Sequence, residues 1–186
     1  MEFEQTKLAG VVLLTPRRFG DDRGWFSETW NKRTLSEGGI GHDFVQDNHS
    51  MSAEVGTLRG LHYQAPPHAQ DKLVRCTAGV IFDVAVDVRV GSPTFGEWVG
   101  YELSATNGQQ LFIPKGFLHG FSTRSVNAEV QYKCTDYYAP ETDGSVRWDS
   151  AGVDWGLTGD PVLSAKDLDA PAFADWTSPF TMENTQ

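Results

Sequence analysis

The sequence has few cysteines, few cations and no long apolar run, and each shortage argues against a class of protein. Only two cysteines, Cys76 and Cys134, occur in 186 residues, so a disulfide framework is not expected and both thiols are predicted to fill core volume. Fifteen Lys and Arg face 25 Asp and Glu, and the net charge of -10 disfavours nucleic acid as a partner. Neither a membrane-spanning run nor a secretory signal is visible, so we expect a soluble, cytoplasmic protein.

Helical patterns are also scarce. Residues 31–40 form the best helix candidate, with Asn31 or Thr34 as a cap and Gly38-Gly39 as the stop. Short strands separated by turn signals are predicted over residues 82–88, 99–103, 110–113, 117–123 and 128–135, after an earlier strand at 11–14. Residues 82–89 alternate apolar side chains with others that include Asp83 and Asp87, which predicts a half-buried strand. This spacing of strands indicates an all-β sandwich or jelly roll.

We predict one domain over residues 1–186: an N-terminal arm (1–50), a barrel core (51–138) and a C-terminal tail (139–186). The tail is punctuated by Pro and Gly, has only short helical segments, and must lie against the barrel to be ordered. In the arm, Asp21-Asp22-Arg23-Gly24 predicts a turn. The aromatic residues on either side are too many for a turn that is surrounded by solvent. Arg23 and Glu28 are either a surface pair or part of a site.

Residues 59–64 carry the most reactive chemistry. A lone histidine such as His62 is more often a hydrogen-bonded core residue than a reactive group. Gly60 is a natural place for a β-bulge, which would allow Arg59 and His62 to face one cavity. Alternation along residues 128–134 points Tyr132 inward, either as a core tyrosine or as a site group.

Two further polar groups are expected near that cavity. Lys72 begins a strand and, if it lies inside a barrel, needs a carboxylate or an anionic substrate; Asp83 is a candidate neighbour. His119 is a second cavity group or a metal ligand. Metal sites of the cupin type use two close histidines, a glutamate and a later histidine, whereas Tyr63 and Gln64 follow His62. We therefore expect neither metal nor other cofactor.

Without a metal, a histidine, a tyrosine and a lysine in one cavity suit proton abstraction next to a carbonyl. The base removes an acidic α-hydrogen, a cation stabilises the enolate oxygen, and an acid on the opposite face returns a proton. A carboxylate bonded to the second nitrogen of the histidine would fix its tautomer. That sequence of steps inverts the carbon.

At this point the motifs resemble a known family, that of dTDP-4-dehydrorhamnose 3,5-epimerase. The resemblance runs from Phe19 to Asp167 and rests on residues 59–64 (RGLHYQ), 72–76 (KLVRC), 82–89 (FDVAVDVR), 92–96 (SPTFG), 113–121 and 163–167 (LSAKD). It implies a metal-free cupin jelly roll that acts as a homodimer. It also implies epimerisation at C3 and C5 of dTDP-4-dehydro-6-deoxy-D-glucose, giving dTDP-4-dehydro-L-rhamnose.

The resemblance also implies roles for individual residues. His62 corresponds to the base, Asp167 to its orienting carboxylate, Tyr132 to the proton donor and Lys72 to the cation beside the enolate. Tyr138 corresponds to the aromatic that stacks on thymine, and Asp143 stands near a position where the family often has glutamate. The implied substrate contacts are Arg23, Phe26, Glu28, Gln46, Asn48, Arg59, Lys72, His119, Tyr138, Asp143 and Lys166. The family's N-terminal segment reaches the neighbouring subunit's site, which would account for the aromatics around Arg23.

Three alternatives stay open at this stage. A 3- or 5-mono-epimerase of a deoxysugar pathway would share the same residues. A metal-dependent cupin oxygenase would share the fold but not the chemistry. A non-catalytic module would bind the sugar nucleotide without turnover.

Overall fold

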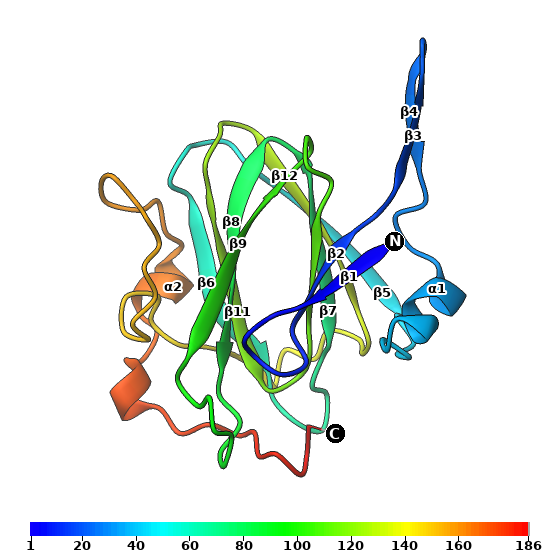
Figure 1. Cartoon of the computed structure of the whole chain (residues 1–186). Coiled ribbons are helices and arrows are strands. Elements are labelled where there is room, and N and C mark those ends of the chain that lie inside the picture. Colours follow the sequence, from blue (N-terminus) through cyan, green and yellow to red (C-terminus); the bar gives the residue numbers. More distant parts are fainter. Residues whose placement is uncertain (186) are drawn as a thin grey trace.

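The computed structural model describes residues 1–185, which form two facing antiparallel β-sheets and a projecting hairpin (Figure 1). The six-stranded sheet has the spatial order β1 (Glu2–Gln5), β2 (Val12–Thr15), β10 (Gln110–Ile113), β7 (Lys72–Ala78), β12 (Ala128–Cys134) and β5 (Gln46–Ser52). The five-stranded sheet has the order β13 (Asp143–Ser145), β6 (Leu58–Gln64), β11 (Phe117–Thr123), β8 (Val80–Asp87) and β9 (Trp98–Ser104). This is the predicted jelly roll. The strands β1, β2 and β5 join the barrel although they lie within residues 1–52.

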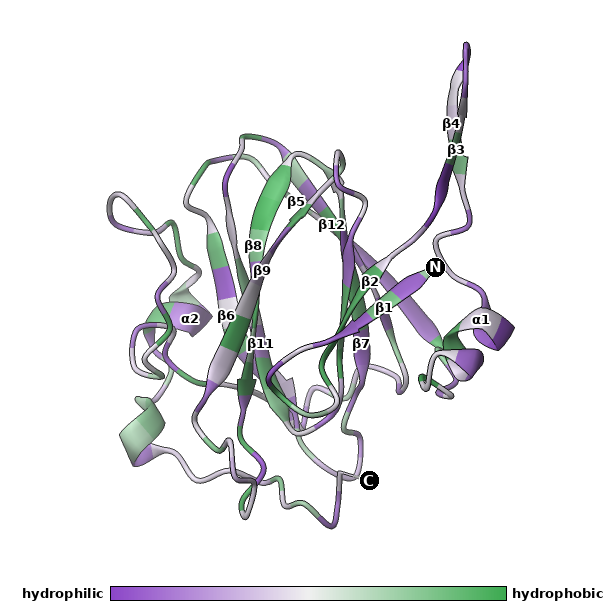
Figure 2. Cartoon of the chain, viewed as in Figure 1, coloured by the Kyte–Doolittle hydropathy of each residue, from purple (hydrophilic) through white to green (hydrophobic). Residues whose placement is uncertain are grey.

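The space between the sheets is filled by the inward side chains of both. Val74 and Val130 come from the six-stranded sheet, and Ile81 and Phe121 come from the five-stranded sheet; all four are buried. Strands hold these residues inward because successive side chains point to opposite faces. Figure 2 shows hydrophobic stretches along β2 and β8 and hydrophilic residues at the tip of the hairpin.

The C-terminal tail covers the outer face of the five-stranded sheet, as the sequence predicts. Leu61 and Val84 of that face pack in one cluster with Trp155 and Phe180 of the tail. The prediction that β8 is half buried is therefore wrong, since Asp83 and the other aspartate of the strand are both 0% exposed. The tail covers the apolar face of β8, and the barrel interior encloses its polar face.

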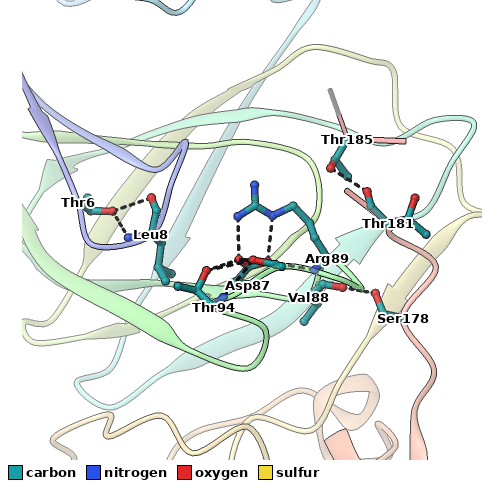
Figure 3. A network of polar contacts seen from close by, with 10 residues as sticks. Thr6, Leu8, Asp87, Val88, Arg89, Thr94, Ser178, Thr181 and Thr185 are labelled. Carbon is teal, nitrogen blue, oxygen red and sulfur yellow. Dashed lines mark hydrogen bonds and ion pairs between the residues drawn. The ribbon is translucent and has the colours of Figure 1, made fainter. Parts of the chain in front are cut away.

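A polar network at the end of β8 joins the strand to the loop that follows (Figure 3). Asp87 accepts hydrogen bonds from Arg89 Nε at 2.9 Å and Arg89 Nη2 at 2.7 Å, and from the hydroxyls of Ser92 at 2.6 Å and Thr94 at 2.7 Å. Ser178 of the tail donates to the carbonyl of the adjacent Val88. Burial alone would raise the pKa of Asp87, but these hydrogen bonds hold that pKa below its usual value.

Helices are short and few in the described chain, in agreement with the sequence. The helix α1 (Lys32–Glu37) begins after Asn31, whose side chain accepts from two backbone N–H groups, so Asn31 is the cap that the pattern offered. The helix α2 (Ala165–Leu168) and the 3₁₀ turn η1 (Phe173–Asp175) lie in the tail. Within residues 1–185, no helix is long and apolar enough to cross a membrane.

The two-stranded hairpin of β3 (Arg18–Asp21) and β4 (Gly24–Ser27) projects away from the barrel (Figure 1). Its base is fixed by Arg18, which donates to the carbonyls of Ala105 at 2.6 Å and Thr106 at 2.5 Å. The arm exposes large fractions of three aromatic side chains, Phe19 (52%), Trp25 (59%) and Phe26 (69%). So much exposed aromatic surface on a projecting element is typical of an interaction site.

Candidate active site

A cavity of about 250 Å³ opens between the two sheets. Its walls come from β5, β7 and β12 of one sheet, from β6 and β13 of the other, and from the loops next to them. The lining residues are Gln46, Asn48, His62, Tyr63, Gln64, Gln70, Lys72, Tyr132, Tyr138 and Asp143. Seven of these are sequence-predicted site residues, and the fold brings them together from segments nearly 100 residues apart.

The predicted bulge at Gly60 is present. In the pairing of β6 with β11, His62 lies opposite His119, but Arg59 lies opposite Phe121, so β6 contains one extra residue. Gly60 has a φ of +127°, and a Cβ there would lie 2.7 Å from Gly120 Cα, so only glycine fits. The extra residue puts Arg59 and His62 on the inner face of the strand.

Arg59 reaches the inner surface of the six-stranded sheet. Its guanidinium donates to the Ser52 hydroxyl at 3.1 Å and to the Met51 carbonyl at 3.2 Å. The side chain is exposed, and its charge acts on Tyr132. Arg59 thus acts on Tyr132 through its charge, but it is not among the residues that line the cavity with His62, so the predicted shared cavity holds for His62 and not for Arg59.

His62 is paired with a carboxylate from the tail. His62 Nε2 lies 2.6 Å from Asp167 Oδ1, and Ser164 donates its hydroxyl to Asp167 Oδ2 at 2.7 Å. Asp167 is 3% exposed; burial would raise its pKa, but the hydrogen bond to His62 and the Ser164 hydroxyl bring the pKa below its usual value. An ionised carboxylate fixes the imidazole and stabilises the imidazolium that proton abstraction would form.

Tyr132 and Lys72 face the same cavity from the six-stranded sheet. Burial raises the pKa of Tyr132, so its hydroxyl stays protonated well above neutral pH and is able to donate. Burial also lowers the pKa of Lys72, against the opposing effects of Cys134, Asp143 and Asp83. His62 lies on β6 of one sheet and Tyr132 on β12 of the other, so the two side chains face the cavity from different sides.

His119 has a carboxylate partner of its own. His119 Nε2 lies 2.8 Å from Asp83 Oδ1, and the imidazole is 7% exposed. With Lys72, it borders a smaller hollow next to the main cavity. Among residues 1–185, no group of three or more His, Cys, Asp or Glu side chains is arranged to hold a metal ion.

The rim of the cavity is formed by Tyr138, Asp143, Lys166 and Gln46. The Tyr138 hydroxyl lies 3.4 Å from Asp143 Oδ2, which also accepts from the Lys166 ammonium. The backbone N–H of Tyr138 donates to Gln46 Oε1 at 2.9 Å, and Gln46 Nε2 donates to Asn48 at 3.1 Å. The tail helix α2 thus contributes one residue to the rim, Lys166, and the next residue, Asp167, to the pair with His62.

Three predicted contacts lie on the arm and not at this cavity. Arg23 pairs with Asp21 at 2.5 Å, and Glu28 accepts from Asn31 at 3.1 Å, so the alternative of an Arg23–Glu28 surface pair is wrong. Arg23 and Phe26 border a separate hollow on the hairpin. Within one chain they do not line the cavity that contains His62.

Some site residues were missed by sequence reasoning. Gln64 is 5% exposed and fixes the rim loop, because it donates to the Tyr137 carbonyl at 2.9 Å and accepts from the Ala139 N–H at 3.0 Å. Gln70 has no local signal that would have found it. Ser164 had one, since Ser-x-x-Asp is a helix-capping pattern, and here the same hydroxyl also holds the carboxylate that pairs with His62.

The chain matches the family model described as dTDP-4-dehydrorhamnose 3,5-epimerase over residues 5–175. It is 52% identical over 179 residues to the dTDP-4-dehydrorhamnose 3,5-epimerase of Pseudomonas aeruginosa, covering 94% of this chain and 97% of the relative. The fold is similar to that of the Bacillus anthracis dTDP-4-dehydrorhamnose 3,5-epimerase with TDP and PPi bound, with a TM-score of 0.90. The two sequences are 48% identical, and the match covers 92% of this chain and 99% of the other.

A second solved structure is informative about ligands. The dTDP-6-deoxy-D-glucose-3,5-epimerase of Legionella pneumophila, in complex with dTDP-4-keto-L-rhamnose, is 45% identical with a TM-score of 0.88 and coverage of 92% of each chain. Model, sequences and structures agree over nearly the whole length. The chain belongs to the dTDP-4-dehydrorhamnose 3,5-epimerase family.

Proposed function

We propose that the protein epimerises C3 and C5 of dTDP-4-dehydro-6-deoxy-D-glucose and gives dTDP-4-dehydro-L-rhamnose for the synthesis of dTDP-L-rhamnose. The observation that carries the proposal is the pairing of His62 with a buried, ionised Asp167 in a cavity whose opposite wall supplies Tyr132. The family membership supports the same reaction.

The reaction uses the acidity of the hydrogens on the two carbons that flank the C4 ketone. His62 takes one of these protons, and the electron pair of the C–H bond moves into an enolate. Lys72 stabilises the negative charge on the C4 oxygen. Tyr132 donates its hydroxyl proton to the carbon from the opposite face, which inverts that carbon. Exchange with water returns His62 and Tyr132 to their starting states, and the steps repeat at the second carbon.

Substrate binding is assigned to the cavity rim and to the arm. Arg59 would contact the diphosphate, Tyr138 would stack on the thymine, and Asp143 and Lys166 would border the nucleotide. The three contacts on the arm, Arg23, Phe26 and Glu28, would be supplied by the partner subunit of a homodimer. The aromatics of the projecting hairpin support this arrangement, because residues 1–185 leave more than half of each of the three side chains exposed. We assign the enzyme to the cytoplasm, where its two thiols remain reduced.

Proton NMR in heavy water tests the proposed reaction. Incubation with dTDP-4-dehydro-6-deoxyglucose should remove the signals of both C3–H and C5–H, and addition of the partner reductase should give dTDP-rhamnose. Exchange at one carbon only would identify a mono-epimerase instead. An absence of exchange, with dTDP still bound, would leave only a binding module and contradict the proposal. Substantial Fe or Ni in the purified protein would favour the oxygenase.

Mixing two inactive variants tests the exchanged arm. Arg23→Ala removes a contact that the arm would donate, and His62→Asn removes the base of the receiving site. A mixed dimer of the two has one site with both groups intact, so activity should reappear on mixing. If each chain completes its own site, the mixture will remain as inactive as its components.

A further inference from the structure

Asp83 is a buried carboxylate that the proposed reaction does not use. It lies on β8, points into the barrel and is 0% exposed. One oxygen, Oδ1, lies 2.8 Å from His119 Nε2. The other, Oδ2, is buried and has no hydrogen-bond partner among residues 1–185. An unpaired carboxylate oxygen in a protein interior is costly, so such an atom calls for a specific explanation.

The cation that matches this oxygen is Lys72. Lys72 and His119 line the same small hollow at the side of the main cavity. The Lys72 ammonium has no ion-pair partner among residues 1–185 within 4.0 Å, although burial lowers its pKa. Asp83 is one of the groups whose charge opposes that effect. Lys72, which is partly buried, thus lines the hollow itself, and the half-paired carboxylate of Asp83 lies behind it as the hydrogen-bond partner of His119.

The other charges around Lys72 do not replace Asp83. Asp143 of β13 also favours the charged form of Lys72, but its carboxylate already accepts a hydrogen bond from Lys166. The positive charge of Lys166 in turn disfavours the charged form of Lys72. Cys134 of β12 is buried, and burial raises the pKa of its thiol, so the thiol is neutral near pH 7. The other titratable groups that line the two hollows with Lys72 are His62, Tyr63, Lys115, His119, Tyr132 and Tyr138, and none of them is a carboxylate.

We propose that Asp83 is a positioning residue for the epimerisation. Its Oδ1 fixes His119 at the side of the cavity, and the negative charge of its unpaired carboxylate stabilises the Lys72 ammonium. The lysine therefore stays charged in a partly dry site and is available to the C4 oxygen of the substrate. The inference rests on the proposed function for its catalytic meaning, but the pairing of Asp83 with Lys72 can be tested without substrate.

The direct test is NMR titration of ¹⁵N-lysine-labelled protein, with Lys72→Met to assign the signal. Asp83→Asn keeps an oxygen to accept from His119 and removes only the charge. The Lys72 signal should then titrate at a pH lower by about one unit or more, the usual effect of losing a close opposite charge. An unchanged Lys72 titration would overturn the proposal, whatever the enzyme's activity.

Kinetics provide the second reading. For Asp83→Asn, the alkaline limb of kcat should move to lower pH in step with Lys72, with a loss of about tenfold at neutral pH. In a protein that already carries Lys72→Met, Asp83→Asn should cause no further loss of kcat, because the two residues act together. A full, independent loss in that background would show that Asp83 acts elsewhere. If Asp83→Asn alone fails to fold, adding Lys72→Met should restore folding; failure of the double variant to fold would also overturn the proposal.

Asp87→Asn is the matched control, since it removes the other buried carboxylate of the same strand. It should lower the melting temperature and leave the Lys72 titration unmoved. If the unmutated protein shows no deuterium exchange while Lys72 still responds to Asp83→Asn, the proposed function fails and the charge pairing stands.

Discussion

Two aspartates on one strand, Asp83 and Asp87, are equally buried but very differently paired. Both carboxylate oxygens of Asp87 are occupied, by the guanidinium of Arg89 and by two hydroxyls. Asp83 uses a single oxygen, on His119, and its second oxygen faces the barrel interior with no hydrogen-bond partner in the described part of the chain. Alternation places the two on the same face of β8, so the difference arises from what surrounds them. A fully satisfied carboxylate holds the fold together, whereas one with a free oxygen marks the place where chemistry needs a charge.

The largest expected effect is on turnover, at His62, which pairs with Asp167 and not with either aspartate of β8. His62→Asn should reduce turnover by about 10³-fold, within the usual range for loss of a general base, with little change in melting temperature. His49→Asn is the control, because His49 pairs with Glu129 on the exposed face of β5. Turnover, measured by reductase-coupled assay, that survives His62→Asn would assign the base to another residue.

Loss of a partner of Asp87, whose two oxygens are both hydrogen-bonded, should lower the stability of the protein and leave its turnover unchanged. Arg89→Ala leaves Asp87 charged and buried, which should lower the free energy of unfolding by about 3 kcal/mol. The folded-state pKa of Asp87 is lowered from 3.8, so its stabilisation is present above that pH and is lost as the pH falls through the folded pKa. Urea unfolding should therefore show a weaker acid dependence below pH 4 in the variant. If Arg89→Ala kept the stability of the unmutated protein but had a lower kcat, Asp87 would not be a purely structural carboxylate and its contrast with Asp83 would fail.

Tyr132→Phe separates the two halves of the reaction. The base remains, so deuterium exchange at the substrate should continue in part, while inverted product should fall by about 10²-fold. Proton NMR follows both quantities in one tube. Inversion at the unmutated rate would show that Tyr132 is not the acid.

Substitutions of Ser164 should have the smallest effect on turnover, and they separate its role as a helix cap from its hydrogen bond to Asp167. Ser164→Ala should lose about 1 kcal/mol from the helix cap and reduce turnover several-fold, because Asp167 loses a hydrogen bond to its second oxygen. Ser164→Thr retains the hydroxyl and should restore both. Ser164→Asp caps the helix but cannot donate to Asp167, so it should recover stability without recovering turnover. Equal recovery of both by Ser164→Asp would reduce Ser164 to a structural cap.

Alternation and turn chemistry were enough to predict much of this arrangement. They gave most strands of the barrel, though neither β1 nor β13, together with the bulge at Gly60 and the inward direction of Tyr132. They could not give the partners of the site residues, because those come from distant segments. Asp167 is 105 residues from His62, and its role followed from family resemblance. The burial of Asp83 depends on a tail and a barrel interior that no local pattern reveals.

The arm shows the other limit of sequence reasoning. Its turn was predicted from Asp21-Asp22-Arg23-Gly24, but the direction of the hairpin depends on Arg18 binding two carbonyls almost 90 residues away. The short strand β13 was missed because three residues carry no measurable periodicity. In both cases the decisive contacts are tertiary.

The extra residue at Gly60 has a consequence for anyone who redesigns this enzyme. Side chains of a regular strand point alternately to its inner and outer faces. The extra residue of the bulge shifts this alternation by one, so that Arg59 and His62 both lie on the inner face. Transplanting the side chains onto a regular jelly-roll strand would therefore send one of them to the wrong face. A graft must copy the irregular backbone, and with it the glycine, before any choice of catalytic residue matters.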